Sequence, residues 1–133
     1  TWTPAPCRAA VKAGAEMILI LNGSPFHRQK QPVREGVLME RANENQCPLL
    51  YVNMVGGQDE LVFDGGSFVL NADLKLQARC ADWYPALQIT NWQRSGDNWM
   101  CEQGETAAAE DSLSSIYSAM LLGLRDYIEK NHP

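Results

Sequence analysis

Two short apolar runs constrain the fold of this chain more than any other feature of its sequence. Glu16–Asn22 is almost continuously apolar, and Leu49–Asn53 repeats the pattern after Pro48. Apolar runs of strand length that do not alternate with polar residues are typical of strands covered on both faces. We therefore expect two central strands of a layered α/β sheet.

Helices are predicted before and between these strands. Pro4 and Pro6 suit the first turn of a helix, and good helix formers continue over 8–13 until Gly14. Residues 31–46 place Val33, Val37, Leu38 and Ala42 on one face of a helix. The order helix, strand, helix, strand indicates α/β layers rather than a helical bundle or an all-β sandwich.

Shorter strands are expected in the next part of the chain. Residues 61–63 and 67–70 are apolar and flank Asp64-Gly65-Gly66, which predicts a hairpin because glycine allows the positive φ of a tight turn. Alternating or mixed polarity predicts two further strands, over 74–79 and 86–92, and a turn over 95–97.

The last predicted element is an amphipathic helix over 111–131. One stripe of this helix carries apolar side chains, at Leu113, Ile116, Tyr117, Met120, Leu121, Leu124 and Ile128. Acidic residues at its start and Lys130 near its end complement the helix dipole. The stripe could face another domain or subunit, but composition favours packing on the helix's own domain.

Charge and composition exclude several classes of protein. With 11 basic and 16 acidic residues the net charge is −5, so we expect no nucleic-acid or acidic-lipid partner. The longest strongly apolar run, residues 17–21, is too short to span a bilayer. The first residue is Thr1 and no signal-like segment precedes the fold, so we expect a cytoplasmic protein whose chain begins downstream of its gene's start.

The cysteines are expected to be reduced, mostly buried thiols. They have no CxxC spacing, and only His27 and His132 could supply nitrogen ligands, so neither a structural zinc site nor another metal is expected. A disulfide-stabilised secreted protein would normally contain cysteine at a higher density. The thiols concerned are Cys7, Cys47, Cys80 and Cys101.

Residues 22–30 form the first candidate binding segment. They follow a predicted strand, and ligands of open α/β sheets bind where strands end. Ser24 offers a hydroxyl, and Arg28 or Lys30 could hold a carboxylate. His27 is a candidate acid or base. The alternative is an ordinary loop between strand and helix, which spacing alone favours.

Residues 53–67 form the second candidate segment. Pairs of glycines flank an acidic cluster, but no nucleotide-binding spacing is present. A metal at Asp59, Glu60 and Asp64 would lack a defined ligand geometry, and the alternative is a bulged hairpin. Three tryptophans, Trp83, Trp92 and Trp99, could line an aromatic pocket. Scattered tryptophans are more often separate anchors in the core or at an interface.

Two strings resemble a known family. Residues 15–27, AEMILILNGSPFH, and 51–68, YVNMVGGQDELVFDGGSF, are similar to bacterial glutamine-dependent NAD synthetases. The resemblance is to the later half of their amino-terminal glutaminase domain, a member of the nitrilase (carbon–nitrogen hydrolase) superfamily. Residues 117–130 resemble the helix that joins this domain to the ligase domain.

The resemblance implies a fold and a domain organisation. It predicts part of a nitrilase-like αββα layered sandwich followed by a C-terminal helix. Residues 1–105 would be the C-terminal portion of the glutaminase domain, and residues 106–133 the connector helix toward an ATP-dependent ligase domain that this chain does not contain.

The resemblance also implies a chemistry. In the family a Glu, Lys and Cys triad hydrolyses glutamine through a thioester, and the ammonia serves the ligase domain, where ATP and Mg²⁺ support amidation of deamido-NAD to NAD. No residue of this chain matches the triad, and none is expected to hold a cofactor. Ser24, Lys30 and Trp2 match glutamine-binding positions. We therefore expect the isolated chain to hydrolyse no glutamine and to bind no ATP.

Two other functions stay open. The chain could be a non-catalytic interaction or oligomerisation module, and self-association through exposed faces is expected in either case. It could also be a fragment of another nitrilase-superfamily amidase, although a stand-alone amidase would need no connector-like helix.

Overall fold

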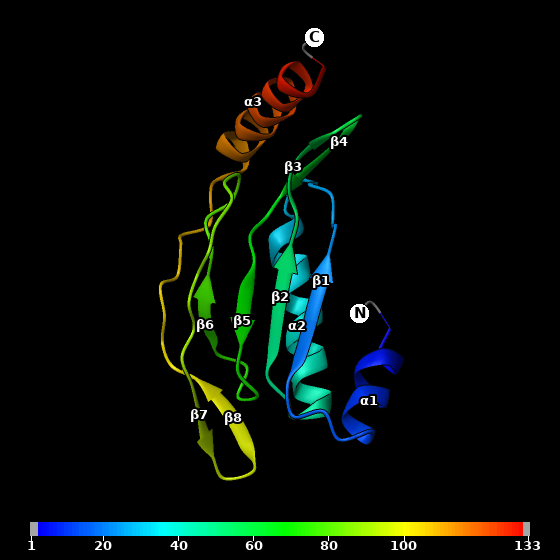
Figure 1. Ribbon diagram of the computed structural model, residues 1–133, viewed down its shortest axis with the longest axis vertical. Helices are drawn as coiled ribbons and strands as arrows, with labels where there is room; N and C mark the ends of the chain where they lie inside the picture. The colour runs from blue at the N-terminus through cyan, green and yellow to red at the C-terminus, as the bar shows by residue number, and fades with distance from the viewer. Residues whose placement is uncertain (1–2, 132–133) are drawn as a thin grey trace.

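The computed structural model describes residues 3–131 and has a four-stranded mixed sheet at its centre (Figure 1). Its strand order is β1-β2-β5-β6, with bounds β1 (Ile18–Asn22), β2 (Leu49–Asn53), β5 (Phe68–Leu70) and β6 (Leu76–Arg79). β1 and β2 are parallel, whereas β5 is antiparallel to both of its neighbours. The strands predicted over 16–22, 49–53 and 74–79 all form, but among the described residues β1 lies at the edge of the sheet rather than at its centre.

Helix α2 (Lys30–Asn45) covers one face of this sheet (Figure 1). Leu38 and Ala42 are fully buried against Leu49 and Leu70 in the main hydrophobic core. The first helix, α1 (Ala5–Lys12), has proline in its first turn as expected and packs against α2. The α/β layering predicted from the sequence is therefore confirmed.

The opposite face of the sheet, called the open face below, differs from the prediction. Leu19 and Leu21 of β1 are 60% and 80% exposed, so the expectation that both faces of this strand are covered is wrong for the described residues. Over β5 and β6 the same face is covered, because Val69 and Ala78 pack with Cys101. The apolar run predicts the strand correctly but does not say what covers it.

The hairpin predicted across Asp64–Gly66 is also wrong. The hairpin is formed by β3 (Val55–Gln58) and β4 (Leu61–Asp64), a two-stranded ribbon that extends past the sheet. β5 pairs with β2 and β6 instead. Gly65 and Gly66 do have positive φ, 75° and 63°, but they lead the chain from the ribbon into the sheet.

The strand predicted over 86–92 does not form. Residues 84–91 have no regular structure, and Leu87 and Ile89 are exposed without a neighbouring strand to pair with. The strands that follow are β7 (Trp92–Ser95) and β8 (Asn98–Cys101), joined at the predicted turn, where Gly96 has a φ of 63°.

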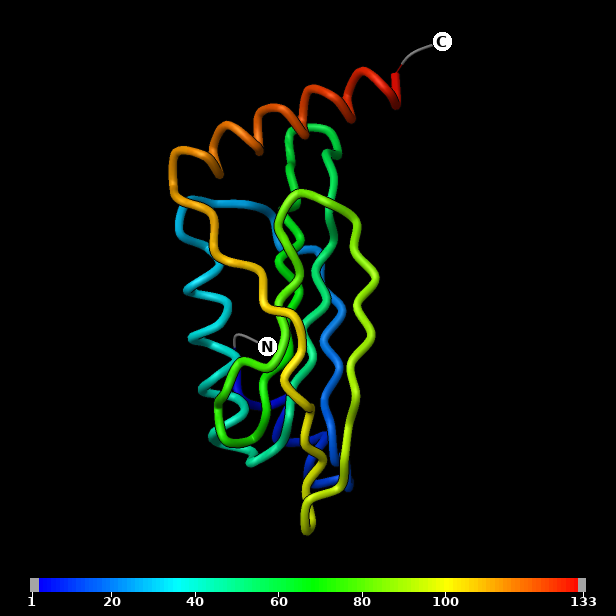
Figure 2. Tube along the Cα trace, turned by 90° about the vertical axis from the view of Figure 1, so that its left-hand side faces the viewer, coloured from blue at the N-terminus to red at the C-terminus, as the bar shows by residue number. Residues whose placement is uncertain are grey.

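Helix α3 (Ser112–Asn131) lies across the ribbon at one end of the molecule (Figure 2). It packs through Ala119, Leu122 and Gly123, and a Cβ on Gly57 would lie 3.2 Å from the Gly123 Cα. The helix thus packs on its own chain, as composition favours, but the predicted apolar stripe faces away from this contact, with Leu113 79% exposed. Among residues 3–131, no helix combines the length and apolarity that crossing a membrane requires.

Candidate functional site

The candidate site lies at the end of the sheet where β1 and β2 both terminate. These strands are parallel, and Asn22 pairs with Asn53 at their carboxyl ends, so the segments that follow them start side by side. The segment after β1 carries Ser24 and leads to α2. This is the placement that the sequence predicted for residues 22–30.

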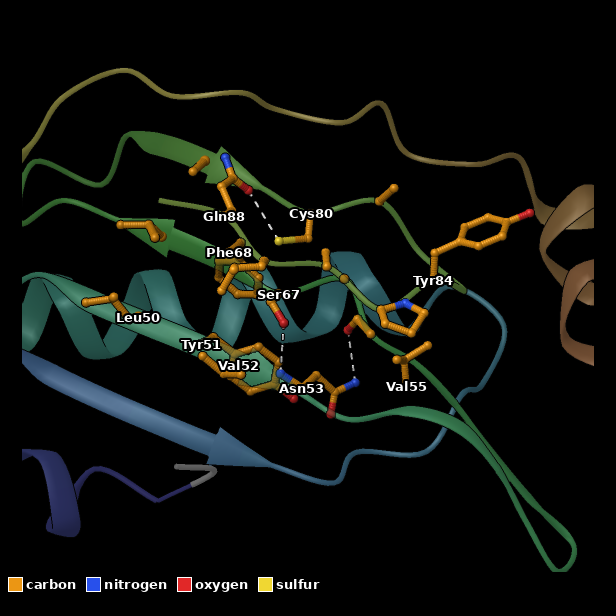
Figure 3. A pocket seen from close by; sticks show the side chains of 18 of the residues that line it. Leu50, Tyr51, Val52, Asn53, Val55, Ser67, Phe68, Cys80, Tyr84 and Gln88 are labelled. Atoms are coloured by element: carbon orange, nitrogen blue, oxygen red, sulfur yellow. Dashed lines mark hydrogen bonds between the residues drawn. The ribbon is translucent and has the colours of Figure 1, made fainter. Parts of the chain in front are cut away.

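Asn53 fixes the backbone around Ser24. The Ser24 N–H donates to Asn53 Oδ1 at 2.8 Å, and Asn53 Nδ2 donates to the Ser24 carbonyl at 3.2 Å. The same amide donates to the Gly65 carbonyl at 3.0 Å, and the Asn53 N–H donates to Ser67 Oγ (Figure 3). Because Asn53 and Ser24 are both buried, these bonds tie the loop to β2 without competition from water.

Arg34 of α2 and Asp64 of β4 form a buried ion pair beside Ser24. Arg34 Nη1 and Nη2 donate to the two Asp64 carboxylate oxygens at 2.7 and 2.8 Å, and the residues are only 2% and 3% exposed. Arg34 Nη2 also donates to the Ser24 carbonyl at 2.8 Å, and Nε donates to Ser24 Oγ at 3.2 Å. Ser24, Asn53, Arg34 and Asp64 are called the Ser24 network below.

The three predicted glutamine-binding residues lie in different settings. Ser24 is held in the network, and Lys30 is the first residue of α2, half-buried, with its N–H donating to the His27 carbonyl at 3.0 Å. Trp2 lies outside the described residues. The contact of these side chains with glutamine stays a prediction.

Lys30 lines a cavity of about 140 Å³ together with Arg28, His27 and Asp64. An aromatic pair lies in its wall, with the rings of Phe26 and Trp83 edge to face at 4.9 Å between centroids. The cavity therefore adjoins the Ser24 network through the Asp64 carboxylate, which both share.

Asp82 contributes a carboxylate to the same cavity. Burial, followed by the negative charges of Asp64 and Glu110, raises the pKa of Asp82 from 3.8 to about 6. Its Oδ1 is buried without a hydrogen-bond partner in the part of the chain that the structure describes. Glu110 is engaged elsewhere, since its carboxylate accepts a hydrogen bond from Trp83 Nε1 at 2.6 Å.

A larger cavity, about 430 Å³, lies against the open face (Figure 3). Apolar side chains such as Leu50 and Val69 form most of its wall, and Asn53 and Cys80 add polar groups. The Cys80 thiol donates to Gln88 Oε1 at 3.2 Å. Burial and then the Glu105 carboxylate raise the pKa of Cys80, so at neutral pH its thiol is a weak nucleophile.

The four cysteines are free thiols, as expected. Burial also raises the pKa of Cys47 and Cys101, which favours the protonated, unreactive form. Between residues 3 and 131, no group of three or more His, Cys, Asp or Glu side chains could hold a metal ion. Asp64 is paired with Arg34 rather than grouped with Asp59 and Glu60.

The hypothetical aromatic pocket of Trp83, Trp92 and Trp99, which the sequence favours less than separate anchors, does not form. Trp83 packs with Phe26 beneath α3, whereas Trp92 packs against the cluster of Val69 and Ala78. Trp99 donates from Nε1 to the Glu16 carboxylate at 3.3 Å. The three tryptophans belong to separate parts of the fold, and the alternative of individual anchors describes them better.

The sequence points to Asp64 only as a possible metal ligand and to Asn53 only as part of residues 53–67, and it does not point to Arg34 at all. The signal that could have found Arg34 is its helical register, because the buried face of α2 runs through Arg34, Leu38, Arg41 and Ala42. The face predicted from the apolar residues included Val33, which is 49% exposed.

Comparison with known proteins places the chain in a sequence family. Residues 1–96 match the family model for carbon-nitrogen hydrolase. Over 98% of its length the chain is 38% identical to the glutamine-dependent NAD(+) synthetase of Rhodobacter capsulatus, and it covers 24% of that protein. The Aquifex aeolicus protein of the same name is 50% identical over 54% of the chain. The chain thus spans about a quarter of the length of the first curated relatives that it matches.

Solved structures agree with this placement. The glutamine-dependent NAD+ synthetase of Acinetobacter baumannii, in complex with ADP, matches 98% of the chain with a TM-score of 0.89 and 30% identity, over 24% of its own length. A mutant amidase of the nitrilase superfamily from Nesterenkonia AN1 matches 63% of the chain with a TM-score of 0.53 and 30% identity, over 31% of its length. The predicted nitrilase-like α/β fold with a C-terminal helix is confirmed.

Proposed function

The chain belongs to the carbon–nitrogen hydrolase family, and we propose on this premise that it forms part of the glutaminase domain of a glutamine-dependent NAD synthetase. One observation carries the proposal. The synthetase structure matches 98% of the chain at a TM-score of 0.89, α3 included, whereas the amidase matches 63% at 0.53. This amidase of the nitrilase superfamily therefore matches the fold less closely than the synthetase does.

The proposed division of the chain follows from the arrangement of its elements. Residues 1–105 would belong to the glutaminase domain, and residues 106–133 would lead toward the ligase domain. Two observations support this division: the family model covers residues 1–96, and α3 packs on the ribbon rather than on the four-stranded sheet. The apolar stripe of α3, which this chain leaves exposed, suits a helix that meets another domain.

The proposed activity is that of the whole enzyme. A Glu, Lys and Cys triad outside the residues of this chain would hydrolyse glutamine, and the ammonia would be used to amidate deamido-NAD with ATP and Mg²⁺ bound by the ligase domain. This chain would contribute Ser24, Lys30 and Trp2 to glutamine binding and no cofactor ligand. The substrates ATP and deamido-NAD favour a cytoplasmic protein.

A chimera tests this function directly. The chain would replace the matching 130 residues of the Rhodobacter capsulatus protein, and NAD formation would be measured with glutamine and, separately, with ammonium salts as nitrogen source. We expect NAD formation from both sources, and no glutamine hydrolysis by the 133-residue chain alone. A chimera that uses ammonium but not glutamine would contradict the proposal, since only its glutaminase part would then have failed.

Self-association is a second proposal, based on exposed apolar surface. Leu19 and Leu21 on the open face, and Leu113 and Tyr117 on α3, are each at least 60% exposed. Contiguous apolar surface of this kind favours contact with another chain or another copy. Light scattering at increasing concentration would test it, and a monomer at all concentrations would contradict it.

A further inference from the structure

We propose that Arg34 is a positioning residue that presents the Ser24 hydroxyl to a ligand as a hydrogen-bond donor. The inference deepens the proposed function and rests on it, because only there does Ser24 contact glutamine. It gives a role in ligand binding to the buried Arg34–Asp64 ion pair, which need not contact glutamine itself.

The first step concerns the Ser24 hydroxyl group. Its oxygen accepts a hydrogen bond from Arg34 Nε at 3.2 Å. A serine hydroxyl has one hydrogen to donate, and the structure shows no acceptor for that hydrogen among residues 3–131. With a donor fixed on one side of the oxygen, the hydroxyl hydrogen must point to another side. The hydrogen of Ser24 Oγ is thereby directed away from Arg34 and is available to a ligand, while the oxygen keeps one further lone pair.

The second step is the rigidity of the arrangement. Arg34 is held by both oxygens of Asp64, at 2.7 and 2.8 Å, and Asn53 holds the Ser24 backbone from β2. The Ser24 position is therefore fixed from three elements, α2, β2 and β4. A buried ion pair is seldom more stabilising than a well-packed apolar pair of similar size. Its geometry, rather than its contribution to folding, explains why Arg34 suits this place.

The third step is the chemistry of the ligand. Asp64 compensates the charge of Arg34, so what remains is a neutral, oriented O–H donor. Such a donor suits a carbonyl or carboxylate oxygen. Glutamine carries such oxygens in its carboxylate and in its side-chain amide. Through its hydrogen, Ser24 would donate to one of these oxygens.

Kinetics of the active chimera test the inference through Ser24→Ala, Arg34→Lys and the double variant. A lost hydrogen bond raises KM for glutamine by about tenfold, and we expect this for Ser24→Ala with kcat little changed. Arg34→Lys keeps a positive charge beside Asp64 but loses the Nε donor, so KM should rise severalfold. If Arg34 acts through Ser24, the double variant should be no worse than Ser24→Ala alone.

The control is Arg41→Lys. Arg41 is buried on the same face of α2, but it pairs with Glu40 and Glu44 rather than contacting Ser24. We expect KM to be unchanged in this variant. Additive effects of Arg34→Lys and Ser24→Ala would overturn the inference, because they would mean that Arg34 acts by another route. An effect of Arg34→Lys without one of Ser24→Ala would overturn it equally.

A measurement without activity separates this inference from the proposed function. In the 133-residue chain, the NMR signal of the Arg34 Nε–H should exchange slowly with solvent, and Ser24→Ala should shift it and speed its exchange. Arg41→Lys should leave it unchanged. An inactive chimera with these NMR effects would refute the proposed function but not the positioning by Arg34, whereas an Arg34 signal that Ser24→Ala does not affect would refute the positioning.

Discussion

The two faces of the four-stranded sheet differ although the same strands form both. On the α2 side, Leu49 and Leu70 are at most 1% exposed, whereas on the open face Leu19 and Leu21 are 60% and 80% exposed. Successive residues of a strand point to opposite faces, so one apolar run supplies both surfaces. An apolar run therefore indicates that a strand can be buried. Which of its faces is buried depends on the helix or strand that packs against it.

The two sides also differ in charge. Where α2 meets the rest of the fold, Arg34 pairs with Asp64, and Glu35 pairs with Arg79 of β6 at 2.5 Å. The open face offers mostly apolar side chains around its cavity. Within the Ser24 network, Arg34 and Asp64 thus lie where α2 packs, whereas Asn53 also lines the cavity on the open face.

The largest effect on the free energy of unfolding is expected where a buried charge on the covered side loses its ion-pair partner. Arg34→Met leaves the Asp64 carboxylate buried without its partner, which should reduce the free energy of unfolding by about 3–5 kcal/mol. Urea denaturation would measure it. The control is Arg34→Met combined with Asp64→Leu, which should recover most of the loss. A single variant that loses under about 1 kcal/mol would show that water reaches Asp64.

Leucine truncations on the two faces compare them directly. Leu70→Ala removes a fully buried side chain and should lower the free energy of unfolding by about 2–5 kcal/mol. Leu21→Ala, at a side chain that is 80% exposed, should change it by no more than about 0.5 kcal/mol. Both are measured by urea denaturation of dilute protein. Equal losses would mean that the open face is covered in solution.

Sequence reasoning could predict the elements with local signals, and it failed where distant residues decide. The strands Ile18–Asn22 and Leu49–Asn53, helix α2 and the placement of Ser24 after a strand all follow from local patterns. The strand that pairs with Phe68–Leu70 cannot be predicted in this way. Glycines at 65 and 66 suit a hairpin turn and a connection from the ribbon into the sheet equally well. Arg34 was missed because its ion-pair partner, Asp64, lies thirty residues away in the sequence.

Asp82 offers a pH test at the rim of the covered side. Its pKa of about 6, above the ordinary 3.8, means that the folded state binds more protons than the unfolded chain between these pH values. Stability should therefore fall as pH rises from about 4 to 6. We expect a contribution of about 1 kcal/mol, reduced because the carboxyl is only partly buried.

The matched variant is Asp82→Asn, which cannot ionise. It should flatten the stability profile between about pH 4 and 6 and be more stable than the parent at pH 7. Urea denaturation at a series of pH values would show this. A profile with the same slope in both proteins would mean that Asp82 is not the group responsible for the pH dependence in this window.

The smallest effect on folding is expected from charges on the open face. Leu19→Lys with Leu21→Lys adds two charges to an exposed edge strand, where they should change the free energy of unfolding by no more than about 0.5 kcal/mol. The same charges should reduce self-association, since lysines on an edge strand oppose pairing with another chain. Light scattering against concentration would detect the change. If the variant associates as the parent does, the apolar stripe of α3 becomes the contact surface, and Tyr117→Lys, also at an exposed position, becomes the decisive variant.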